Sequence, residues 1–154
     1  MDELMEVNEN NRIQYIVVLI GSENYGIDIK YVDNIVRMQK ITRVPKAQQY
    51  FRGVINLRGE IVPVMSVRRK MDLGDDEFTK DSRIIILKIE EHGNLGIVVD
   101  AVREVVTLGP DEIEHNNSRD VSNTFINGIG KNGEQLISLF DINKIIEDKE
   151  NPLS

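Results

Sequence analysis

A β-hairpin is predicted by the run Gly53-Val54-Ile55-Asn56-Leu57-Arg58-Gly59-Glu60-Ile61-Val62-Pro63-Val64. Strand-forming Val, Ile and Leu residues lie on both sides of a polar turn. Arg58-Gly59 supplies the reversal, since glycine accepts the backbone angles that tight turns require. The arginine carries five donors in a rigid fork, which suits it to a partner's carboxylates or carbonyls. Because the run holds no Ser, Cys, His or Lys, it indicates a binding surface rather than an enzyme.

Length and composition limit the classes of fold and partner. The 154 residues are 40% hydrophobic, enough for one compact unit or two very small modules that share a core. Aromatic residues make up only 5%, so Ile, Val and Leu must fill the interior. The net charge of −7 repels nucleic-acid phosphates and anionic lipid, which argues against both partners. With no cysteine, the chain has no disulfide, thiolate nucleophile or cysteine zinc site.

The sequence contains no targeting or membrane-spanning segment that we can identify. Its acidic start, Met1-Asp2-Glu3-Leu4-Met5-Glu6, lacks the basic and long apolar regions of a signal peptide. No apolar stretch approaches the roughly 18 residues that cross a bilayer. We therefore expect a cytoplasmic protein that does not insert into the membrane.

An internal repeat organises the chain. Residues 25–36 align with residues 95–106 at a constant offset, which pairs Gly26 with Gly96. Each half also ends in a short segment that begins with a good helix N-cap residue, Ser66 in the first half and Asp141 in the second. Duplication of one unit explains this ordered agreement better than chance similarity between apolar strands. Further pairs at this offset or a slightly larger one are Ile27 with Ile97, Val32 with Val102, Phe51 with Phe125, and Gly59 with Gly133.

Short β-branched runs bounded by turn residues predict small antiparallel barrels. Strands are expected at residues 13–20 and 84–89. Closure into a barrel would remove the exposed edges of such short strands. Reversals are expected at Glu23-Asn24, Gly93-Asn94, Asn127-Gly128 and Asn132-Gly133.

The pattern Gly-Val-x-Asn-Leu-Arg-Gly-x-Ile-x-Pro of residues 53–63 resembles the signature of the CheW family. Members of this family join chemoreceptors to the histidine kinase CheA. Segments 25–29 and 96–100 also match the family pattern, and the similarity runs from about residue 14 to residue 147. The resemblance implies a mostly β fold of two pseudo-symmetric, SH3-like, five-stranded antiparallel barrels with short helices and a shared apolar core.

The expected domain organisation follows from that resemblance. One CheW-like domain is expected, with a polar linker or surface loop at residues 73–82 and a terminal strand that crosses between barrels. The expected ranges are a disordered tail at 1–11, the domain at 12–147, barrels at about 12–72 and 83–147, and a flexible tail at 148–154.

The resemblance implies a non-enzymatic adaptor with two partners, the cytoplasmic tip of a chemoreceptor and the regulatory domain of CheA. It implies no catalytic residue, metal or cofactor, and a monomer when the protein is isolated. Many relatives carry glutamate at the position of Asn34, so a charge contact is not expected there. The receptor-binding residues implied are Arg58, Asn56, Val32, Asn34, Ile84, Gly96 and Val105, and the kinase-binding residues are Val36, Ile41 and Val44.

Within the receptor-binding set, Arg58 is expected to donate hydrogen bonds to receptor helices. Asn56 is expected to brace the turn, whose backbone Gly53 and Gly59 set. The other members of the set also fit core or sheet positions.

Other functions remain open from sequence. Residues 128–133 match the dinucleotide pattern G-x-G-x-x-G, but a predicted strand follows them where a helix is required. His92 and His115 have the sequence context of surface residues, and the run Arg68-Arg69-Lys70 that of a solvated helix face. A small-ligand-binding barrel, or a weak hydrolase using Ser66 or the aspartates Asp28, Asp100 and Asp141, would require a deep pocket with converging polar groups. An isolated CheA-type regulatory module would share the fold, although no catalytic or phosphoacceptor segment accompanies it.

Overall fold

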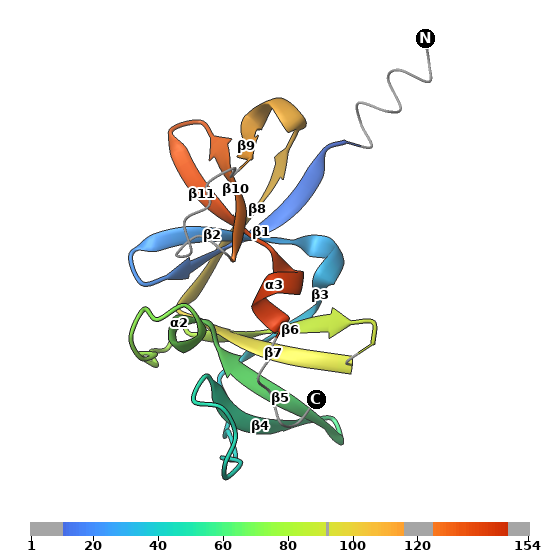
Figure 1. The fold of residues 1–154 in the computed structure, drawn as a ribbon, viewed down its shortest axis with the longest axis vertical. Coiled ribbons are helices and arrows are strands. Elements are labelled where there is room, and N and C mark those ends of the chain that lie inside the picture. The colour runs from blue at the N-terminus through green and yellow to red at the C-terminus, as the bar shows by residue number, and fades with distance from the viewer. Residues whose placement is uncertain (1–10, 92, 116–124, 148–154) are drawn as a thin grey trace.

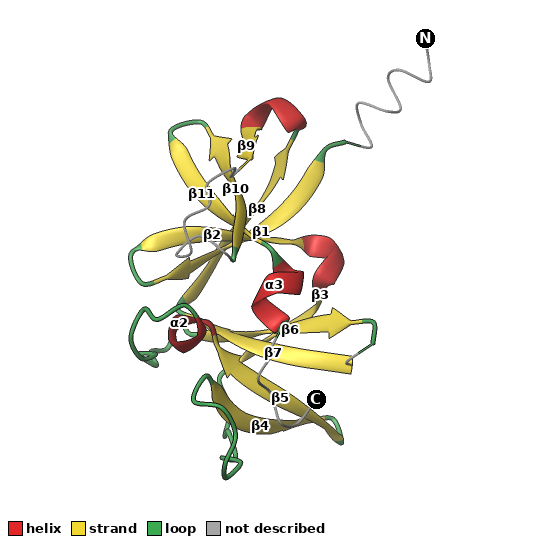
Figure 2. Ribbon diagram, in the orientation of Figure 1, coloured by secondary structure: helices red, strands yellow, loops and turns green. Residues whose placement is uncertain are grey.

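The structure is a computed structural model that describes residues 11–91, 93–115 and 125–147. In these ranges the chain forms two β-sheets stacked along the long axis of the molecule, with short helical segments between and beside them (Figures 1 and 2). The elements are β1 (Ile13–Ile20), β2 (Glu23–Asp28), η1 (Ile29–Tyr31), β3 (Val32–Arg37), β4 (Phe51–Leu57), β5 (Glu60–Ser66), α2 (Val67–Lys70), β6 (Arg83–Ile89), β7 (Gly93–Val99), β8 (Ala101–Leu108), η2 (Pro110–Glu112), β9 (Ile113–His115), β10 (Ile126–Asn132), β11 (Gln135–Phe140) and α3 (Ile142–Ile146).

The two sheets have the same strand order once the internal repeat is applied. Sheet A runs β8-β1-β2-β11-β10-β9, and sheet B runs β3-β6-β7-β5-β4. The repeat maps β1, β2, β8, β11 and β10 onto β6, β7, β3, β5 and β4, which converts one order into the other. The mostly β, pseudo-symmetric fold expected from sequence is therefore confirmed. Sheet A contains one more strand than expected, because the short β9 pairs with β10.

The two halves of the chain exchange their first hairpins. The β1–β2 hairpin lies in sheet A with strands of the second half, and the β6–β7 hairpin lies in sheet B with strands of the first half. Because of this exchange, β2 pairs with β11 and β5 pairs with β7 in parallel, so neither sheet is wholly antiparallel. A division into 12–72 and 83–147 thus does not separate the sheets, since a whole hairpin crosses in each direction.

Each sheet curls around an apolar interior of its own. In sheet B, Val36 of one edge strand and Ile55 of the other edge strand belong to the same cluster. In sheet A, Val106 and Leu108 of β8 share a cluster with Ile113 of the opposite edge strand β9. Contact between opposite edges means that both sheets are rolled into small barrels, which side chains fill.

A third cluster lies between the sheets and joins them. Alternate residues of β1 serve two clusters: Tyr15 and Val17 lie inside sheet A, and Ile16, Val18 and Ile20 lie in the shared cluster. This double burial explains why the strand has no polar alternation. The equivalent strand β6 divides in the same way, with Ile84 and Ile86 inside sheet B and Ile85 and Leu87 in the shared cluster.

Two capped helices close the shared cluster. The Ser66 hydroxyl accepts from the Arg69 backbone N–H at 3.1 Å, and the Asp141 carboxylate accepts from that of Lys144 at 3.3 Å. Both caps were expected from the repeat. Behind them Val67 of α2 and Ile142 and Ile145 of α3 are buried in the shared cluster.

The paired glycines of the repeat permit close packing at equivalent places. Gly26 lies opposite Leu139 in the β2–β11 pair, and Gly96 lies opposite Val64 in the β7–β5 pair. A Cβ on Gly26 would come within 2.8 Å of Leu139 Cδ2, and one on Gly96 within 2.7 Å of Ile84 Cγ2. A larger side chain at either position would therefore force buried neighbours to shift.

Three of the four expected reversals are placed differently in the structure. The β1–β2 turn is at residues 21–22, before Glu23-Asn24, and Gly93-Asn94 begins β7 after a turn at residues 90–91. Asn127-Gly128 lies inside β10 at a β-bulge, because the extra residue absorbs the change of register with β11. Asn132-Gly133 does lie at the β10–β11 reversal.

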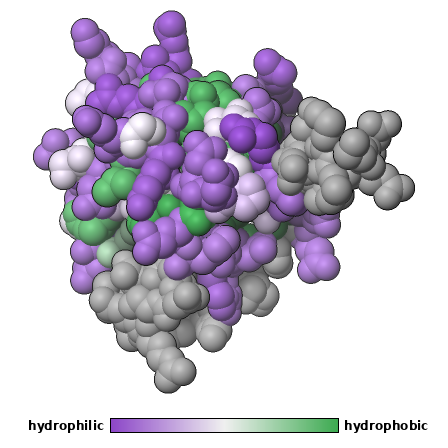
Figure 3. Space-filling view, turned by 90° about the horizontal axis from the view of Figure 1, so that it is seen from above, coloured by the Kyte–Doolittle hydropathy of each residue, from purple (hydrophilic) through white to green (hydrophobic). Residues whose placement is uncertain are grey.

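The expected tails at 1–11 and 148–154 lie outside the described residues, except for position 11. Residues 73–82 form no strand or helix, as expected of a surface loop. In the described ranges, no helix has the length and apolar character that a bilayer crossing requires. Seen from the end where sheet A lies, the visible surface is mostly hydrophilic, with small apolar patches (Figure 3).

Candidate protein-binding surfaces

The β4–β5 hairpin presents Arg58 at a rigid tip. Arg58 and Gly59 have φ angles of +54° and +87°, the left-handed pair that suits the twist of a two-residue hairpin. Asn56 accepts a hydrogen bond from the Gly59 backbone N–H at 2.9 Å, which braces the turn as expected. Arg58 is exposed, and no described residue forms a hydrogen bond or ion pair with its guanidinium. Its fork of donors is therefore available to a partner.

Gly53 has a different role from the one expected, because it lies in β4 and not in the turn. Its φ angle is +141°, and a Cβ there would overlap the backbone carbonyl of Thr42. Thr42 and Val54 exchange two backbone hydrogen bonds of 2.8 Å beside it. Gly53 therefore allows the connection between β3 and β4 to pass directly against the sheet.

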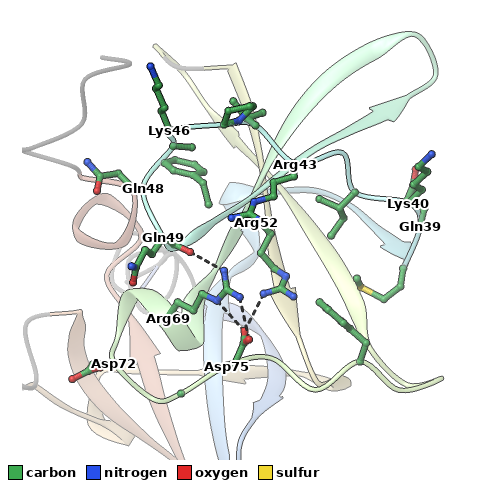
Figure 4. A pocket seen from close by; sticks show the side chains of 18 residues that line it. Gln39, Lys40, Arg43, Lys46, Gln48, Gln49, Arg52, Arg69, Asp72 and Asp75 are labelled. Carbon is green, nitrogen blue, oxygen red and sulfur yellow. Dashed lines mark hydrogen bonds and ion pairs between the residues drawn. The ribbon is translucent and has the colours of Figure 1, made fainter.

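That connection, which we call the strap (residues 38–50), forms one wall of a groove on sheet B. The opposite wall is the loop of residues 72–78, and the groove has a volume of about 1430 Å³ (Figure 4). Apolar side chains line the groove, and basic side chains that Figure 4 labels lie at its rim. The apolar members are Met38, Ile41, Val44, Pro45, Ala47, Phe51 and Phe78.

The strap carries positive charge that is not neutralised by the described part of the chain. Lys40, Arg43 and Lys46 line the groove and are exposed. None of the described residues forms an ion pair or hydrogen bond with these side chains. In a chain of net charge −7 this is a local reversal of sign. Such a surface favours an acidic partner.

The floor of the groove is fixed by a cluster of ion pairs around Asp75 (Figure 4). Arg69 donates to both oxygens of Asp75, with Nε at 2.9 Å and Nη2 at 3.0 Å, and Arg52 Nη1 lies at 3.0 Å. Arg69 also donates to the Gln49 carbonyl of the strap at 2.9 Å. The hydrogen bonds from Arg69 hold the pKa of Asp75 well below its usual range. The loop, the helix α2 and the strap are thereby tied together.

Asp76 is the least well partnered charge in this cluster. Its side chain is 1% exposed, and neither carboxylate oxygen has a hydrogen-bond partner among the described residues. Arg52 Nη1 lies 3.4 Å from one oxygen. Burial raises the pKa of Asp76, and the neighbouring Asp75 adds to this, while the nearby Ser66 hydroxyl, Arg52 and Arg68 act in the opposite sense. Burial outweighs the combined effect of the Ser66 hydroxyl and the two arginines.

Replacing Asp76 with asparagine is expected to stabilise the fold at pH 7 by about 1 kcal/mol, because it removes an incompletely paired buried charge. Folding raises the pKa of the Asp76 carboxyl group, so its protonated form favours the folded state. This contribution to stability is complete below the unfolded pKa and is lost as the pH rises through the folded pKa. The advantage of Asp76→Asn should therefore shrink as pH falls toward about 3.9, the ordinary aspartate value. Urea unfolding of both proteins across this range measures it, and an advantage independent of pH contradicts it.

The described residues leave no cavity inside either barrel for a small ligand, and they exclude Ser66 as a nucleophile. Side chains fill the interior of each barrel, so the grooves lie outside. Ser66 is fully buried, and its hydroxyl caps α2, so it cannot act as a nucleophile. Residues 128–133 run from β10 into a turn followed by β11, which excludes a dinucleotide site. In the same ranges no group of three His, Asp or Glu residues could hold a metal ion.

Comparison with known proteins identifies the family to which the chain belongs. A family model described as CheW-like domain matches residues 14–150. The chain belongs to the CheW family. Its sequence is similar to the chemotaxis protein CheW of Bacillus subtilis, with 35% identity over 144 residues that cover 90% of this chain and 89% of that protein. The CheW of Klebsiella aerogenes is 31% identical over 142 residues, covering 91% and 85%.

A solved CheW-family structure confirms the fold. The chain is similar to the scaffolding protein TtCheW from Thermoanaerobacter tengcongensis, with a TM-score of 0.81 and 32% identity. The match covers 89% of this chain and 94% of that one.

The residues expected on the receptor face of this CheW-family chain are only partly accessible. Val105 of β8 is 52% exposed, and Val32 and Asn34 of β3 are half-buried. Ile84 is fully buried and Gly96 is buried against it, so the prediction of a direct contact through either is wrong. Their positions are fixed by packing inside sheet B.

The residues expected on the kinase face lie around the strap. Val36 and Ile41 are half-buried against the interior of sheet B, and Val44 is 37% exposed. Val44 also borders a second groove, on the side of sheet B that meets α3. Apolar members of that groove include Pro63, Leu95 and Ile146.

The ionic cluster beneath the strap was not predicted from sequence. The run Arg68-Arg69-Lys70 was expected to form a solvated face, but each of these side chains contacts a partner. Arg68 pairs with Asp100, and Arg69 pairs with Asp75. Lys70 Nζ lies over the Tyr50 ring, 4.1 Å from its centroid. The signal was the acidic run that follows the basic run within a few residues. His115 is exposed as expected, and His92 lies outside the described residues.

Proposed function

We propose that this CheW-family chain is a non-enzymatic, cytoplasmic chemotaxis adaptor that couples the cytoplasmic tips of chemoreceptors to the histidine kinase CheA. Family membership supports the proposal, since the relatives named above are chemotaxis proteins and one is described as a scaffold. The observation that carries it furthest in this chain is the Arg58 fork on a braced turn, which no described residue pairs. The chain is proposed to be a monomer when isolated and to need no cofactor or metal.

The receptor face is proposed to comprise Arg58, Val32, Asn34 and Val105, with Asn56 as the brace of the turn. A helical partner can use the exposed apolar surface at Val105 and the Arg58 guanidinium, which has no partner among the described residues. A receptor helix that carries carboxylates or unpaired carbonyls would accept hydrogen bonds from Arg58.

The kinase face is proposed to be the strap, with Val36, Ile41 and Val44 as its apolar contacts. Lys40 and Arg43 stand beside them without ion-pair partners in the described residues. An acidic edge on the regulatory domain of CheA would complement these charges and speed association.

The adaptor transfers no chemical group. It holds receptor and kinase at a fixed separation, which raises their effective concentration toward each other. A change in the receptor can then bias kinase activity because both are bound to one rigid body.

Reconstitution tests this function. CheA autophosphorylation is measured with receptor-containing vesicles, with and without the chain. We expect the receptor to stimulate CheA only when the chain is present, because the chain supplies the link. Bovine serum albumin at equal concentration controls for crowding. Stimulation of equal size in the absence of the chain, or none in its presence, would contradict the proposal.

A further inference from the structure

The described part of the chain crosses between the two barrels at only two places, beside the shared apolar cluster that packs them together. Because the first hairpins are exchanged, the chain passes from sheet A to sheet B between β2 and β3 and returns between β7 and β8. The first crossing is η1, a single helical turn at Ile29–Tyr31. The second crossing is one residue, Asp100. Such short connections are where two packed bodies can rotate against each other.

Asp100 is bound from both barrels. Its carboxylate accepts a hydrogen bond from the backbone N–H of Gly21, in the β1–β2 turn of sheet A, at 2.8 Å. The same oxygen is paired with the guanidinium of Arg68, on the helix that follows β5 of sheet B. Its own backbone N–H donates to the Leu19 carbonyl at 2.9 Å. The carboxylate therefore bridges two barrels at the point where the chain crosses.

The partner Arg68 is itself held in place by sheet B. Its neighbours Ser66 and Val67 fix the start of α2 through the cap and through burial in the shared cluster. A second Arg68 nitrogen, Nη1, donates to the Asp75 carbonyl at 3.1 Å. The side chains of Arg68 and Asp100 are 14% and 17% exposed, so water screens the pair far less than a surface pair.

The repeat shows that this bridge is specific to one crossing. Lys30 occupies the position equivalent to Asp100, and Asn143 that of Arg68. Lys30 Nζ lies 3.9 Å from Asp28 of its own segment, and its backbone N–H bonds the same residue. In the described residues, no ion pair joins the two barrels at this first crossing. The Arg68–Asp100 pair, which we call the clamp, is therefore an addition to the duplicated fold and not a consequence of it.

We propose that Arg68 and Asp100 are positioning residues that fix the angle between the two barrels, and hence the geometry that the adaptor imposes on its partners. The structural part stands on the contacts above, and only its effect on signalling rests on the proposed function. Without the pair, each barrel keeps its own interior cluster and its own surface, while rocking about the two crossings becomes easier. Each partner then binds as before, but the coupling between them weakens.

Distance measurements between the barrels test the clamp without any partner. The chain has no native cysteine, so Ile61→Cys in sheet B and Leu136→Cys in sheet A, both 60% exposed, can carry spin labels. Pulsed electron paramagnetic resonance should give a narrow distribution of the distance between the two labels in the parent. Arg68→Gln and Asp100→Asn should each broaden it about twofold, and the double variant no further, since the two act as one unit. Arg103→Gln, an exposed cation on β8 next to the crossing, should leave it unchanged.

Thermal melting of the same labelled proteins confirms that each variant is folded. If the Asp100→Asn variant does not fold, the Arg68→Gln variant alone tests the clamp, because it keeps the hydrogen bond from Gly21 to Asp100. A distribution as narrow as the parent's in a folded Arg68→Gln variant would overturn the clamp, and so would equal broadening in Arg103→Gln.

A second arm measures the consequence for signalling. Affinities of Arg68→Gln for the CheA regulatory domain and for a receptor tip fragment should stay within about twofold of the parent, since neither proposed face includes it. Receptor-dependent stimulation of CheA should fall by about threefold or more. Broadened distances with unchanged stimulation would overturn the positioning role while leaving the clamp. Failure of the parent to bind either partner would instead contradict the proposed function, and the distance arm would stand.

Discussion

Replacement of Gly53 by alanine should destabilise the chain by about 3 kcal/mol or more, because two costs coincide there. The φ angle of +141° lies in a region that L-residues with a Cβ rarely adopt. The new methyl group would also overlap the backbone carbonyl of Thr42 and approach Arg43 Cα to 3.0 Å. Backbone cannot give way as a side-chain end can, so the strap would have to leave the sheet.

Gly59 provides the matched control. It too has a left-handed φ, +87°, but a Cβ there would meet no atom within 4 Å. Gly59→Ala should therefore cost only backbone strain, about 1 kcal/mol. Urea unfolding of both variants gives the free energies of unfolding. Equal losses in the two would mean that the strap does not rest against Gly53 as the structure has it.

Reversal of the hairpin-tip charge, Arg58→Glu, should weaken receptor binding about tenfold or more. Loss of charge-assisted hydrogen bonds accounts for about 1.5–3 kcal/mol, and the new carboxylate adds repulsion wherever the receptor presents acidic groups. The fold should not change, since no described residue pairs with the Arg58 side chain. Isothermal titration against a receptor tip fragment measures the effect.

Two comparisons make the Arg58 result interpretable. Lys80→Glu reverses the charge of an exposed side chain in the 73–82 loop and should change receptor affinity little. Affinity of Arg58→Glu for the CheA regulatory domain should match the parent's, because the strap is a separate surface of sheet B. An unchanged receptor affinity would remove Arg58 from the binding face, and an equal loss with Lys80→Glu would attribute the effect to net charge.

Local features of the fold could be predicted from sequence because neighbouring residues determine them. The hairpin around Arg58-Gly59, the Asn56 brace and the caps at Ser66 and Asp141 each depend on residues within three or four positions. The repeat also predicted that both halves would form the same unit. The family resemblance added the barrels and their shared core.

Non-local features could not be predicted in the same way. Exchange of the first hairpins depends on which strand edges meet, and both arrangements satisfy the same apolar alternation. Asn127-Gly128 has the sequence of a tight turn, yet pairing with β11 keeps it within a bulged strand.

The family resemblance also identified candidate binding positions without revealing their exposure. Ile84 and Gly96 match family positions on the receptor face, but both are buried where β7 packs against β5 and β6. Residues under packing constraint and residues that bind a partner are equally restricted in type, so one sequence does not separate them. Arg68 and Asp100 were not paired in advance because 32 residues separate them and only the crossing between barrels brings them together.

An adaptor must bind its two partners at once. Sequential calorimetric titration tests it: the chain is first saturated with the CheA regulatory domain and then titrated with a receptor tip fragment. The adaptor account predicts that the receptor fragment binds the preformed complex with the affinity that it has for the chain alone. Displacement of the kinase domain by the receptor, or no binding of either partner, would contradict it.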